Sequence, residues 1–325
     1  MSLQDPERQP ESHKPVVYCV LINWNGWADT LACVASLKQQ NYRSLHVLVV
    51  DNDSSDDSLA HLANCCSAEE LLRATRNDGF AAGCNLGIRV ALKAGADFVW
   101  LLNNDTTAPV DTLSLLLKTT STTVDAAERK VRKAGHSHPG LVGTVLHFMH
   151  EPARVQAWGG GTVKRWLGYT THFVKPTSLP SDGFLTFASV LIRREVFEEI
   201  GLLDERFFMY FEDADFCFRA QSAGWAVAVA PETAVLHKEG GSTRKDVRAG
   251  GKVPFTLRVS TASGLHFLSL HGRPKLLSML LFLLSRVAKR ALSGDLAGLR
   301  AVFAGAADWR RKVLHRSPKT QEDGR

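Results

Sequence analysis

Short apolar segments alternate with amphipathic ones through the first hundred residues of the chain. The apolar segments are rich in β-branched residues, which is typical of strands buried on both faces of a sheet. They cover residues 16–22, 45–50 and 98–102, and the helices expected between them cover residues 28–40, a segment that begins near residue 57, and 79–93. This alternation predicts an α/β fold with a mostly parallel, Rossmann-like sheet flanked by helices.

A polar turn follows each of these three strands, at residues 23–26, 51–55 and 103–106. In sheets of this kind ligands bind beyond the carboxyl ends of the strands, so three polar turns there favour a shared ligand site. Asn, Asp, Ser and Gly also suit turns for conformational reasons alone, and that alternative explains part of the pattern.

After residue 120 the pattern is less regular, and the sequence predicts fewer elements. We expect a short charged helix over 126–133, a flexible turn over 158–161, an apolar segment over 184–193, a helix over 194–200, a strand over 226–235 that Pro231 interrupts, and helices over 276–291 and 297–314. The first of these two C-terminal helices is apolar at its start and basic at its end.

The composition is that of an ordinary globular protein. The 325 residues (35.7 kDa) are 45% hydrophobic and 22% charged, which argues against a disordered chain. No run of about 18 apolar residues is present, so no transmembrane helix is expected. The first fifteen residues are polar and lack the apolar core of a secretory signal, which predicts a cytoplasmic protein. The six cysteines are scattered without a CxxC pair, which argues against a zinc or thioredoxin-type motif.

The positive charge is concentrated in the C-terminal tail. From Arg273 onward the chain has 12 Lys/Arg and 4 Asp/Glu, whereas the preceding residues have 27 and 29. The nearly neutral body argues against nucleic acid as a partner, and the basic tail favours a membrane surface. The leucines of residues 276–284, ahead of Arg286, would allow a helix to lie peripherally in the inner face of the cell membrane. The same stretch is equally compatible with packing inside the fold or against a second copy of the chain in a homodimer.

Asp105 and His237 are candidate metal ligands. Asp105 directly follows a buried strand, and Mg²⁺ or Mn²⁺ is typically held by one or two carboxylates together with phosphate oxygens of the substrate. The alternative for Asp105 is a cap on the turn or helix that follows. His237 follows another apolar strand and suits a mixed metal site, although a lone histidine is more often structural.

Glu212 and Asp213 are candidate general bases. They follow the aromatic run of residues 207–211, and bulky apolar neighbours can shift the pKa of a carboxylate in a way that suits a base. The alternative is a helix N-terminus, where acidic residues favour the helix dipole, and both can hold at once. The sequence does not choose between Asp213, Glu212 and Asp215.

The glycine-rich segment over residues 77–87 does not fit a dinucleotide-binding motif. It lacks the GxGxxG pattern and follows no clear strand, and no GxxxxGK[ST] motif occurs anywhere in the chain. A Rossmann dehydrogenase and a P-loop NTPase are therefore both disfavoured.

Five segments, in the same order, closely resemble glycosyltransferase family 2. They are NWNG at 23–26, VVDNDS at 49–54, residues 77–88, LLNNDT at 101–106, and residues 191–237. The resemblance covers roughly residues 16–237, and it is strongest to the rhamnosyltransferase-like branch of bacterial polysaccharide enzymes.

The resemblance implies a GT-A fold, a nucleotide-sugar donor, a divalent metal and inversion at the anomeric carbon. Asp105 stands at the end of the segment that matches the family's DxD motif, so it would coordinate the metal, and His237 would contact the metal or the diphosphate. Asp213, in the pair with Glu212, would be the general base. The residues that would contact the nucleotide sugar are Asn23, Trp24, Asn25, Asp51, Asp53, Asn77 and Asn104.

Two departures from the family affect the predicted specificity. The stretch TFAS at 186–189 replaces small residues, so Phe187 could narrow the donor or acceptor pocket, and residues 258–267 lack the Arg-Asn pair that relatives often carry. Rhamnose therefore remains one candidate donor sugar, and the acceptor is expected to be a glycan or a lipid-linked molecule.

The resemblance divides the chain into three parts: a flexible leader over 1–14, a GT-A catalytic domain over 15–245, and a basic C-terminal helical extension over 246–325. Two other functions fit the sequence less well. A catalytically degenerate nucleotide-sugar-binding relative is disfavoured because Asp105, Asp213 and His237 are retained. A nucleotidyltransferase is disfavoured because residues 23–30 contain no lysine or arginine for a triphosphate loop.

Overall fold

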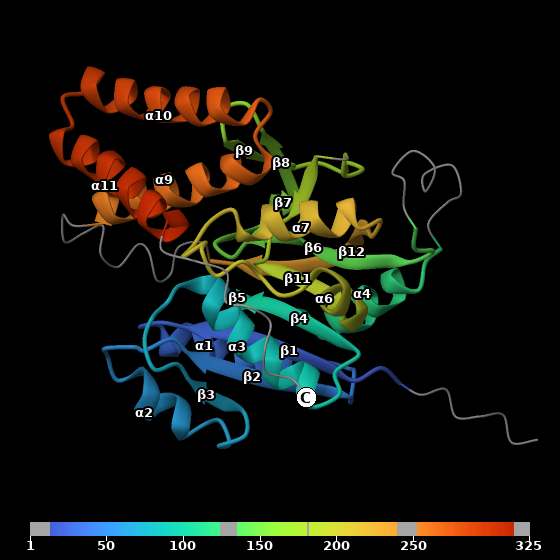
Figure 1. Ribbon diagram of the computed structural model, residues 1–325. Coiled ribbons are helices and arrows are strands. Elements are labelled where there is room, and N and C mark those ends of the chain that lie inside the picture. The colour runs from blue at the N-terminus through green and yellow to red at the C-terminus, as the bar shows by residue number, and fades with distance from the viewer. Residues whose placement is uncertain (1–13, 124–134, 181, 239–251, 315–325) are drawn as a thin grey trace, which may run out of the picture.

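The computed structural model describes residues 14–123, 135–180, 182–238 and 252–314 (Figure 1). The charged helix predicted over 126–133 and nearly all of the predicted leader lie outside the described residues. Within them, helices cover both faces of one large sheet, and three further helices form a layer at one end of the molecule.

The first part of the chain alternates strands with helices, as the apolar pattern predicts. Its elements are β1 (Val17–Asn23), α1 (Trp27–Leu37), β2 (Leu45–Asp51), α2 (Ser58–Ala63), β3 (Leu71–Arg73), α3 (Phe80–Lys93) and β4 (Phe98–Asn103). The four strands are parallel and lie in the order β3-β2-β1-β4. Their carboxyl ends therefore meet at one edge of the sheet.

The second part of the chain extends this sheet in mixed directions. Its elements are β5 (Thr106–Thr107), α4 (Thr112–Thr120), β6 (Pro139–Phe148), β7 (Glu151–Trp158), β11 (Ser189–Arg193), α6 (Arg194–Ile200), α7 (Glu212–Ser222) and β12 (Ala226–His237). The sheet continues from β4 through β11, β6 and β12 to β5, and β7 pairs with β6. β6 and β12 are parallel to each other, whereas β11 is antiparallel to both of its neighbours, so the sheet is mostly parallel.

A small second sheet stands beside the large one. It has the order β10-β8-β9, from β8 (Gly160–Lys164), β9 (Tyr169–His172) and β10 (Gly183–Leu185). The flexible turn predicted over 158–161 is wrong for Gly160 and Gly161, because both lie in β8. A Cβ atom on either would come within 1.8 Å of a carbonyl oxygen of a neighbouring strand, so close packing rather than flexibility explains them.

The central strands are buried on both faces, which produces two hydrophobic layers. On β1, Val20 packs into the layer that contains Ile88 of α3, whereas Leu21 packs into the layer that contains Cys33 of α1. Gly87 allows α3 to approach closely, since a Cβ there would lie 2.4 Å from a methyl carbon of Val20. The continuous apolar runs that predicted these strands thus reflect burial on two sides.

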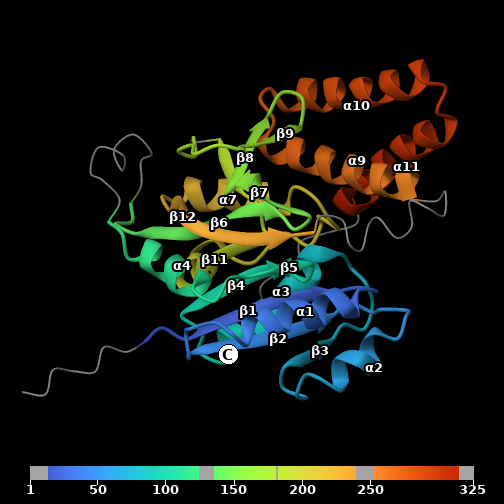
Figure 2. The same ribbon diagram turned by 180° about the vertical axis from the view of Figure 1, so that it is seen from behind.

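Three C-terminal helices form the layer at the end of the molecule. They are α9 (Lys252–His271), α10 (Lys275–Leu292) and α11 (Leu296–Leu314). In both views α10 lies beside the small sheet, and α9 runs between α10 and the rest of the molecule (Figures 1 and 2). Phe267 of α9 and Phe282 of α10 are buried in the same hydrophobic layer as α3 and α7. No helix among the described residues is long and apolar enough to span a bilayer.

The structure confirms the predicted α/β class with a mostly parallel sheet and C-terminal helices. The sequence did not predict β3, α4, α9 or any of the strands from β5 to β9. Helix α9 is buried over most of residues 261–268, so it shows no polar face from which a helical period could be recognised.

Candidate functional site

The carboxyl edge of β1, β2 and β4 brings the three polar turns together. Asn23 and Asp51 are direct partners in the parallel pairing of β1 with β2, and Asn103 pairs opposite Ile22. Asn23 Nδ2 donates a hydrogen bond to Asp51 Oδ1 at 2.9 Å, and both side chains are buried. The prediction that these turns share one edge of the sheet is therefore confirmed.

Thr30 of α1, which the sequence did not single out, joins two of the turns. Its hydroxyl donates to Asn23 Oδ1 at 2.8 Å and accepts from Asn104 Nδ2 at 2.8 Å. Thr30 is fully buried, and Asn104 is 9% exposed. Hydrogen bonds link Asp51, Asn23, Thr30 and Asn104 in series and satisfy polar groups that would otherwise be costly to bury. They therefore hold the turns at this edge of the sheet in place without a ligand.

Hydrogen bonds also join the turn after β1 to the turn after β2. Asn25 and Asp53 both have positive φ, 52° and 59°, a conformation that Asn and Asp tolerate better than most residues. Asn25 Oδ1 accepts from the backbone N–H of Ser55 at 2.8 Å, and Ser54 Oγ donates to Asp51 Oδ1 at 2.6 Å. Asp53 is exposed, and Trp24 is half-buried at the end of β1.

Asn77 lies at the start of α3, on the side of β2. Its Oδ1 accepts from the backbone N–H of Gly79 and from Asn52 Nδ2, each at 3.0 Å. Gly79 has φ 100°, and a Cβ there would lie 2.2 Å from the carbonyl oxygen of Phe208. Phe80 N–H donates to that same oxygen at 2.6 Å, so this turn anchors the loop that leads to Glu212.

Asp105 and His237 converge just beyond the sheet. The two residues come from the turn after β4 and the last position of β12, and His237 Nε2 lies 3.2 Å from Asp105 Oδ1. Each residue is 9% exposed. The other ring nitrogen, Nδ1, lies 2.8 Å from Gln156 Oε1 of β7. Since that oxygen is an acceptor, Nδ1 carries a proton, and in the neutral ring Nε2 has the lone pair that a metal ion would bind.

This arrangement fits a divalent cation. A carboxylate oxygen of Asp105 and the Nε2 nitrogen of His237 face each other, and Asn103 Nδ2 lies 3.4 Å from the same Nε2. The described residues contain no cluster of three or more His, Cys, Asp or Glu suited to a metal. Two protein ligands are nonetheless sufficient for Mg²⁺ or Mn²⁺ when phosphate oxygens and water complete the coordination shell. The sequence did not reveal Gln156, because no sequence pattern identifies the residue that hydrogen-bonds to the second ring nitrogen of a histidine ligand.

A cavity of about 450 Å³ adjoins this pair and contains the acidic candidates. Asn103 lines it and also contacts His237, which connects the cavity to the Asp105 edge. Glu212 and Asp213 begin α7, and Phe187, the residue that departs from the family pattern, lines the same cavity. Other side chains and backbone in the lining come from the small sheet, the loop before α7, α9 and α10, including Tyr169, Phe184, Tyr210, Ser260 and Arg286.

The loop before α7 is held in an unusual conformation. Tyr210 and Phe211 have φ values of 73° and 68°, in the left-handed region that bulky residues rarely adopt. The hydrogen bond from Ser263 Oγ of α9 to the carbonyl oxygen of Met209, 2.8 Å long, is one of the contacts that maintain it. Strain of this kind persists only where surrounding contacts impose it, and it concentrates at functional sites.

Burial raises the pKa of both acidic residues of the cavity. The pKa of Glu212 is raised to about 8 by burial and by the charge of Asp213. Burial also raises the pKa of Asp213, to about 6, although backbone N–H groups of Ala214 and Phe187 oppose the rise. Glu212 Oε2 is buried and has no hydrogen-bond partner among the described residues. Asp213, which is half-buried, therefore combines a cavity position with a raised basicity.

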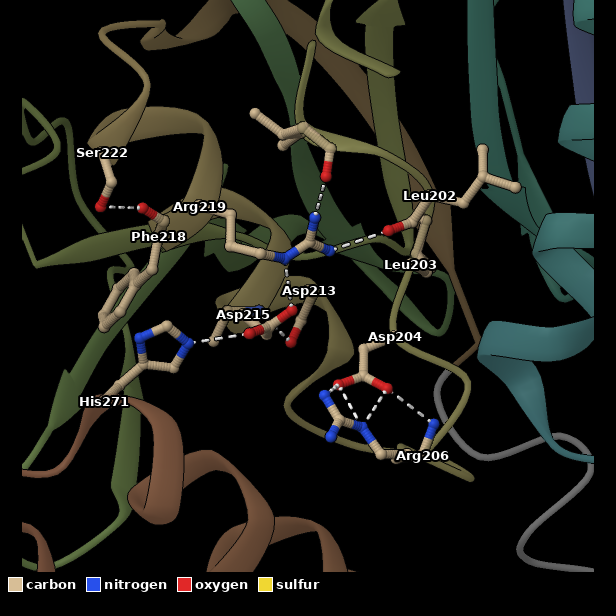
Figure 3. Close-up of polar contacts among 12 residues, drawn as sticks. Leu202, Leu203, Asp204, Arg206, Asp213, Asp215, Phe218, Arg219, Ser222 and His271 are labelled. Atoms are coloured by element: carbon tan, nitrogen blue, oxygen red, sulfur yellow. Dashed lines mark hydrogen bonds and ion pairs between the residues drawn. The ribbon is translucent and has the colours of Figure 1, made fainter. Parts of the chain in front are cut away.

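Asp215 has a different environment (Figure 3). Its carboxylate accepts from Arg219 Nε at 2.8 Å and lies 2.8 Å from His271 Nε2, and it is 1% exposed. Arg219 also donates to the carbonyl oxygens of Ile200 and Leu202. Asp215 does not line the cavity, so its geometry is that of a structural link between α7, α9 and the loop after α6.

Asp215→Asn is expected to destabilise the fold. Removing one partner of a buried ion pair leaves Arg219 without its countercharge, and we expect a loss of about 3 kcal/mol in the free energy of unfolding. Urea denaturation measures it. Glu198→Gln, which removes the exposed partner of Arg194, is the matched control and should cost at most about 0.5 kcal/mol. Equal losses in the two variants would contradict a structural role for Asp215.

Glu212→Gln is expected to change how stability depends on pH. A carboxyl group whose pKa is raised on folding keeps its proton in the native state while the unfolded chain loses it, so stability falls as pH rises from about 4.5 to about 8. Because Glu212 Oε2 makes no hydrogen bond with the described part of the chain, the glutamine variant should gain at least about 1 kcal/mol at pH 8 and less at pH 5. Urea denaturation at both pH values tests this, and a gain independent of pH would contradict it.

Comparison with known proteins identifies the chain. A model of glycosyl transferase family 2 matches residues 18–201. The chain belongs to this family. It is thus a glycosyltransferase, as the five sequence segments predict. The matched residues include Asn23, Asp51 and Asp105, whereas Glu212, Asp213 and His237 lie beyond them.

Curated relatives of this glycosyltransferase support the rhamnosyltransferase-like branch. The chain is 26% identical over 234 residues to dTDP-rhamnosyl transferase RfbF of Shigella flexneri, which covers 70% of this chain and 71% of the relative. It is 28% identical over 231 residues to N-acetylglucosaminyl-diphospho-decaprenol L-rhamnosyltransferase of Mycobacterium tuberculosis, covering 66% of this chain and 73% of the relative.

Solved structures agree with the GT-A fold of this glycosyltransferase. The mannosyltransferase PcManGT from Pyrobaculum calidifontis, solved with GDP-Man and Mn²⁺, superposes with a TM-score of 0.53 at 16% identity, over 94% of this chain and 77% of that one. Residues 1–349 of S. aureus TarS, solved with UDP-GlcNAc, give a TM-score of 0.52 at 14% identity, over 91% and 81%.

Proposed function

We propose that this glycosyltransferase moves a sugar from a nucleoside-diphosphate donor to a hydroxyl group of a glycan or lipid-linked acceptor, with inversion and with a divalent metal. The observation that carries the proposal is the adjacency of two sites. The Asp105–His237 pair lies at the carboxyl edge of the sheet, and the cavity that Asp213 lines meets it at Asn103. The Asp105–His237 pair suits a diphosphate with its metal ion, and the cavity beside Asp213 suits a hydroxyl nucleophile.

The donor would lie along the carboxyl edge of β1, β2 and β4. Asn23, Asp51 and Asn104 are already fixed to one another through Thr30, so they form the floor of the donor site. The exposed turn atoms around Trp24, Asn25, Asp53 and Asn77 are left to contact the nucleotide. A divalent cation held by Asp105 and His237 would neutralise the charge that develops on the leaving diphosphate.

The acceptor would lie in the cavity beside Asp213. As the acceptor oxygen attacks the anomeric carbon, its proton passes to the Asp213 carboxylate, and the bond between the sugar and the diphosphate breaks on the opposite face. A pKa near 6 makes Asp213 a stronger base than an ordinary aspartate while leaving it mostly ionised at pH 7. A single displacement of this kind inverts the anomeric configuration and needs no covalent enzyme intermediate.

The names of the two curated relatives guide the choice of substrates. Both are named for rhamnosyl transfer, so dTDP-rhamnose is the first donor to test, and one is named for a diphospho-decaprenol acceptor. The structure adds support for a lipid-linked acceptor through α10. Leu276, Leu280 and Leu284 recur every four residues on this helix and are at least half exposed.

We propose that this leucine face contacts the membrane that carries the acceptor. The exposed basic residues Arg273, Lys275 and Lys289 flank the face and would favour anionic headgroups. Flotation with vesicles of neutral or anionic lipid measures the contact. Binding to anionic vesicles that Leu280→Glu reduces supports it. A dimer in solution that Leu280→Glu dissociates, with no vesicle binding, would assign the face to a second copy of the chain.

The donor site is tested by thermal denaturation with nucleoside diphosphates and nucleotide sugars, with and without Mn²⁺ or Mg²⁺. A ligand that binds only the folded state raises the midpoint by mass action. We expect one nucleotide to stabilise the protein in a metal-dependent way. If no nucleotide stabilises the protein with either metal, the proposed donor site is contradicted. The protein is then better described as a catalytically degenerate relative of the family.

A further inference from the structure

Arg286 of α10 lies in the wall of the cavity that also contains Asp213. It reaches this position because α10 packs against α9 and the small sheet, which Figures 1 and 2 both show. Its Nη1 donates to the hydroxyl groups of Ser260 at 2.9 Å and Thr261 at 3.0 Å. The guanidinium also stacks over the ring of Phe282, with Cζ 4.4 Å from the ring centre. The arginine is therefore held in place by neutral groups.

The charge of Arg286 has no counterpart within the described part of the chain. No described Asp or Glu lies within ion-pair distance of its guanidinium, and burial lowers its pKa to about 10. Two other arginines of the C-terminal helices do have carboxylate partners, since Arg290 pairs with Asp295 and Arg258 pairs with Asp308. A largely buried cation without an anion is unfavourable unless a ligand supplies the negative charge.

The hydrogen-bonding capacity of Arg286 is also incompletely used. A guanidinium has five N–H donors, and the bonds formed with described residues use Nη1 alone. The Nε and Nη2 groups remain as a planar pair of donors. Such a pair matches two oxygens of a phosphate and binds them more strongly than a neutral donor would.

The cavity thus has opposite charges in its wall, with Glu212 and Asp213 at the start of α7 and Arg286 on α10. We propose that Arg286 binds a phosphate or diphosphate group of the acceptor, while the hydroxyl to be glycosylated lies at Asp213. This inference rests on the proposed function, and it names a glycosyl phosphate or diphosphate as the class of acceptor. It also assigns α10 a role in selecting the acceptor.

The proposal is tested by measuring the binding of phosphorylated probes in the presence of EDTA. EDTA removes divalent cations, so a metal ion at the donor site cannot contribute to the binding. The probes are glucose 1-phosphate, methyl glucoside as the same sugar without phosphate, and inorganic pyrophosphate, titrated by calorimetry into the full chain. We expect glucose 1-phosphate to bind more tightly than methyl glucoside, and Arg286→Gln to weaken it about tenfold or more. Arg286→Lys should recover part of the affinity. Arg290→Gln, one turn further along α10, should leave it unchanged.

Two results would overturn the proposal. Equal binding of glucose 1-phosphate by the wild type and Arg286→Gln would show that the arginine does not hold the phosphate. Binding of pyrophosphate through Arg286 without binding of glucose 1-phosphate would assign the site to a free phosphate ion instead of an acceptor.

Metal-dependent stabilisation by a nucleotide separates this proposal from the proposed function. Arg286→Gln should retain that stabilisation, which shows that it folds and keeps the donor site. If the wild type binds glucose 1-phosphate through Arg286 but binds no nucleotide, the phosphate site at Arg286 is supported and the proposed transferase mechanism is contradicted.

Discussion

Asp213→Asn is expected to lower kcat by about 10²–10⁴-fold, the contribution typical of a positioned general base. Asparagine has nearly the same shape as aspartate and can keep the hydrogen bond that Asp213 Oδ1 accepts from Ala214 N–H at 2.7 Å. The cavity should therefore stay intact, and the affinity for the nucleotide donor should change little. Steady-state kinetics together with donor binding measures both quantities. A kcat within threefold of the wild type would contradict the role of Asp213.

The pH profile gives this prediction a second readout. A base acts in its ionised form, so the wild-type rate should rise with pH through about 6 and level off above it. The two carboxyl groups interact, so the apparent pKa belongs to the pair of Glu212 and Asp213. The rise should disappear in Asp213→Asn. If Glu212→Gln abolishes the rise and Asp213→Asn retains it, Glu212 is the base instead.

Asp105→Ala is expected to remove metal-dependent donor binding and to lower kcat/KM by about a hundredfold or more. A cation at a breaking phosphate bond typically contributes several kcal/mol of charge stabilisation, and each 1.4 kcal/mol corresponds to a factor of ten. Thermal denaturation with the stabilising nucleotide and Mn²⁺ measures the binding, and steady-state kinetics measures kcat/KM. The control is Asp111→Ala, which changes an exposed carboxylate before α4, outside the site, and should leave the metal dependence in place.

The histidine partner gives a graded test of the same site. His237→Ala should weaken Mn²⁺-dependent nucleotide binding, since it removes the second ligand that faces Asp105. Gln156→Ala should weaken it by about 10–100-fold, because the 2.8 Å contact that orients His237 Nδ1 is lost. If Gln156→Ala and His237→Ala both bind the metal–nucleotide complex as the wild type does, the cation does not lie at this pair.

Much of the fold could be predicted because burial leaves a direct mark on the sequence. The runs at residues 16–22 and 98–102 are apolar at every position, and only the exposed His46 interrupts the run at 45–50. These runs are apolar because β1, β4 and the second half of β2 are covered on both faces. Parallel strands place their carboxyl ends together, so the polar turns around Asn23, Asp51 and Asn103 could be assigned to one edge from their order alone. Helix α6 begins and ends at the predicted residues.

The parts of the site that could not be predicted depend on contacts between distant segments. Thr30 looks like an ordinary helix residue until β1 and the turn after β4 place Asn23 and Asn104 on either side of its hydroxyl. Gln156 and His237 are 81 residues apart in the chain. Asp213 and Asp215 have the same side chain, and only packing gives Asp215 the two partners Arg219 and His271.

The C-terminal helices show the same limit. The tail could be recognised as basic, but its sequence predicts that Arg286 follows the leucines of residues 276–284 to the same surface. In the structure Arg286 lines the cavity, whereas Lys289 is exposed. One helix carries both, and the direction of each side chain follows from how α10 packs on α9, which no local pattern records.

The stereochemistry of the first product tests the central claim most directly. Incubated with a donor of known anomeric configuration and without acceptor, the protein should hydrolyse it slowly, with water in the place of the acceptor hydroxyl. Proton NMR during the first minutes identifies the sugar anomer before it equilibrates in solution. A single displacement assisted by Asp213 predicts the inverted anomer, formed far more slowly by Asp213→Asn. A first product with the donor's own configuration would require two displacements and would contradict the mechanism.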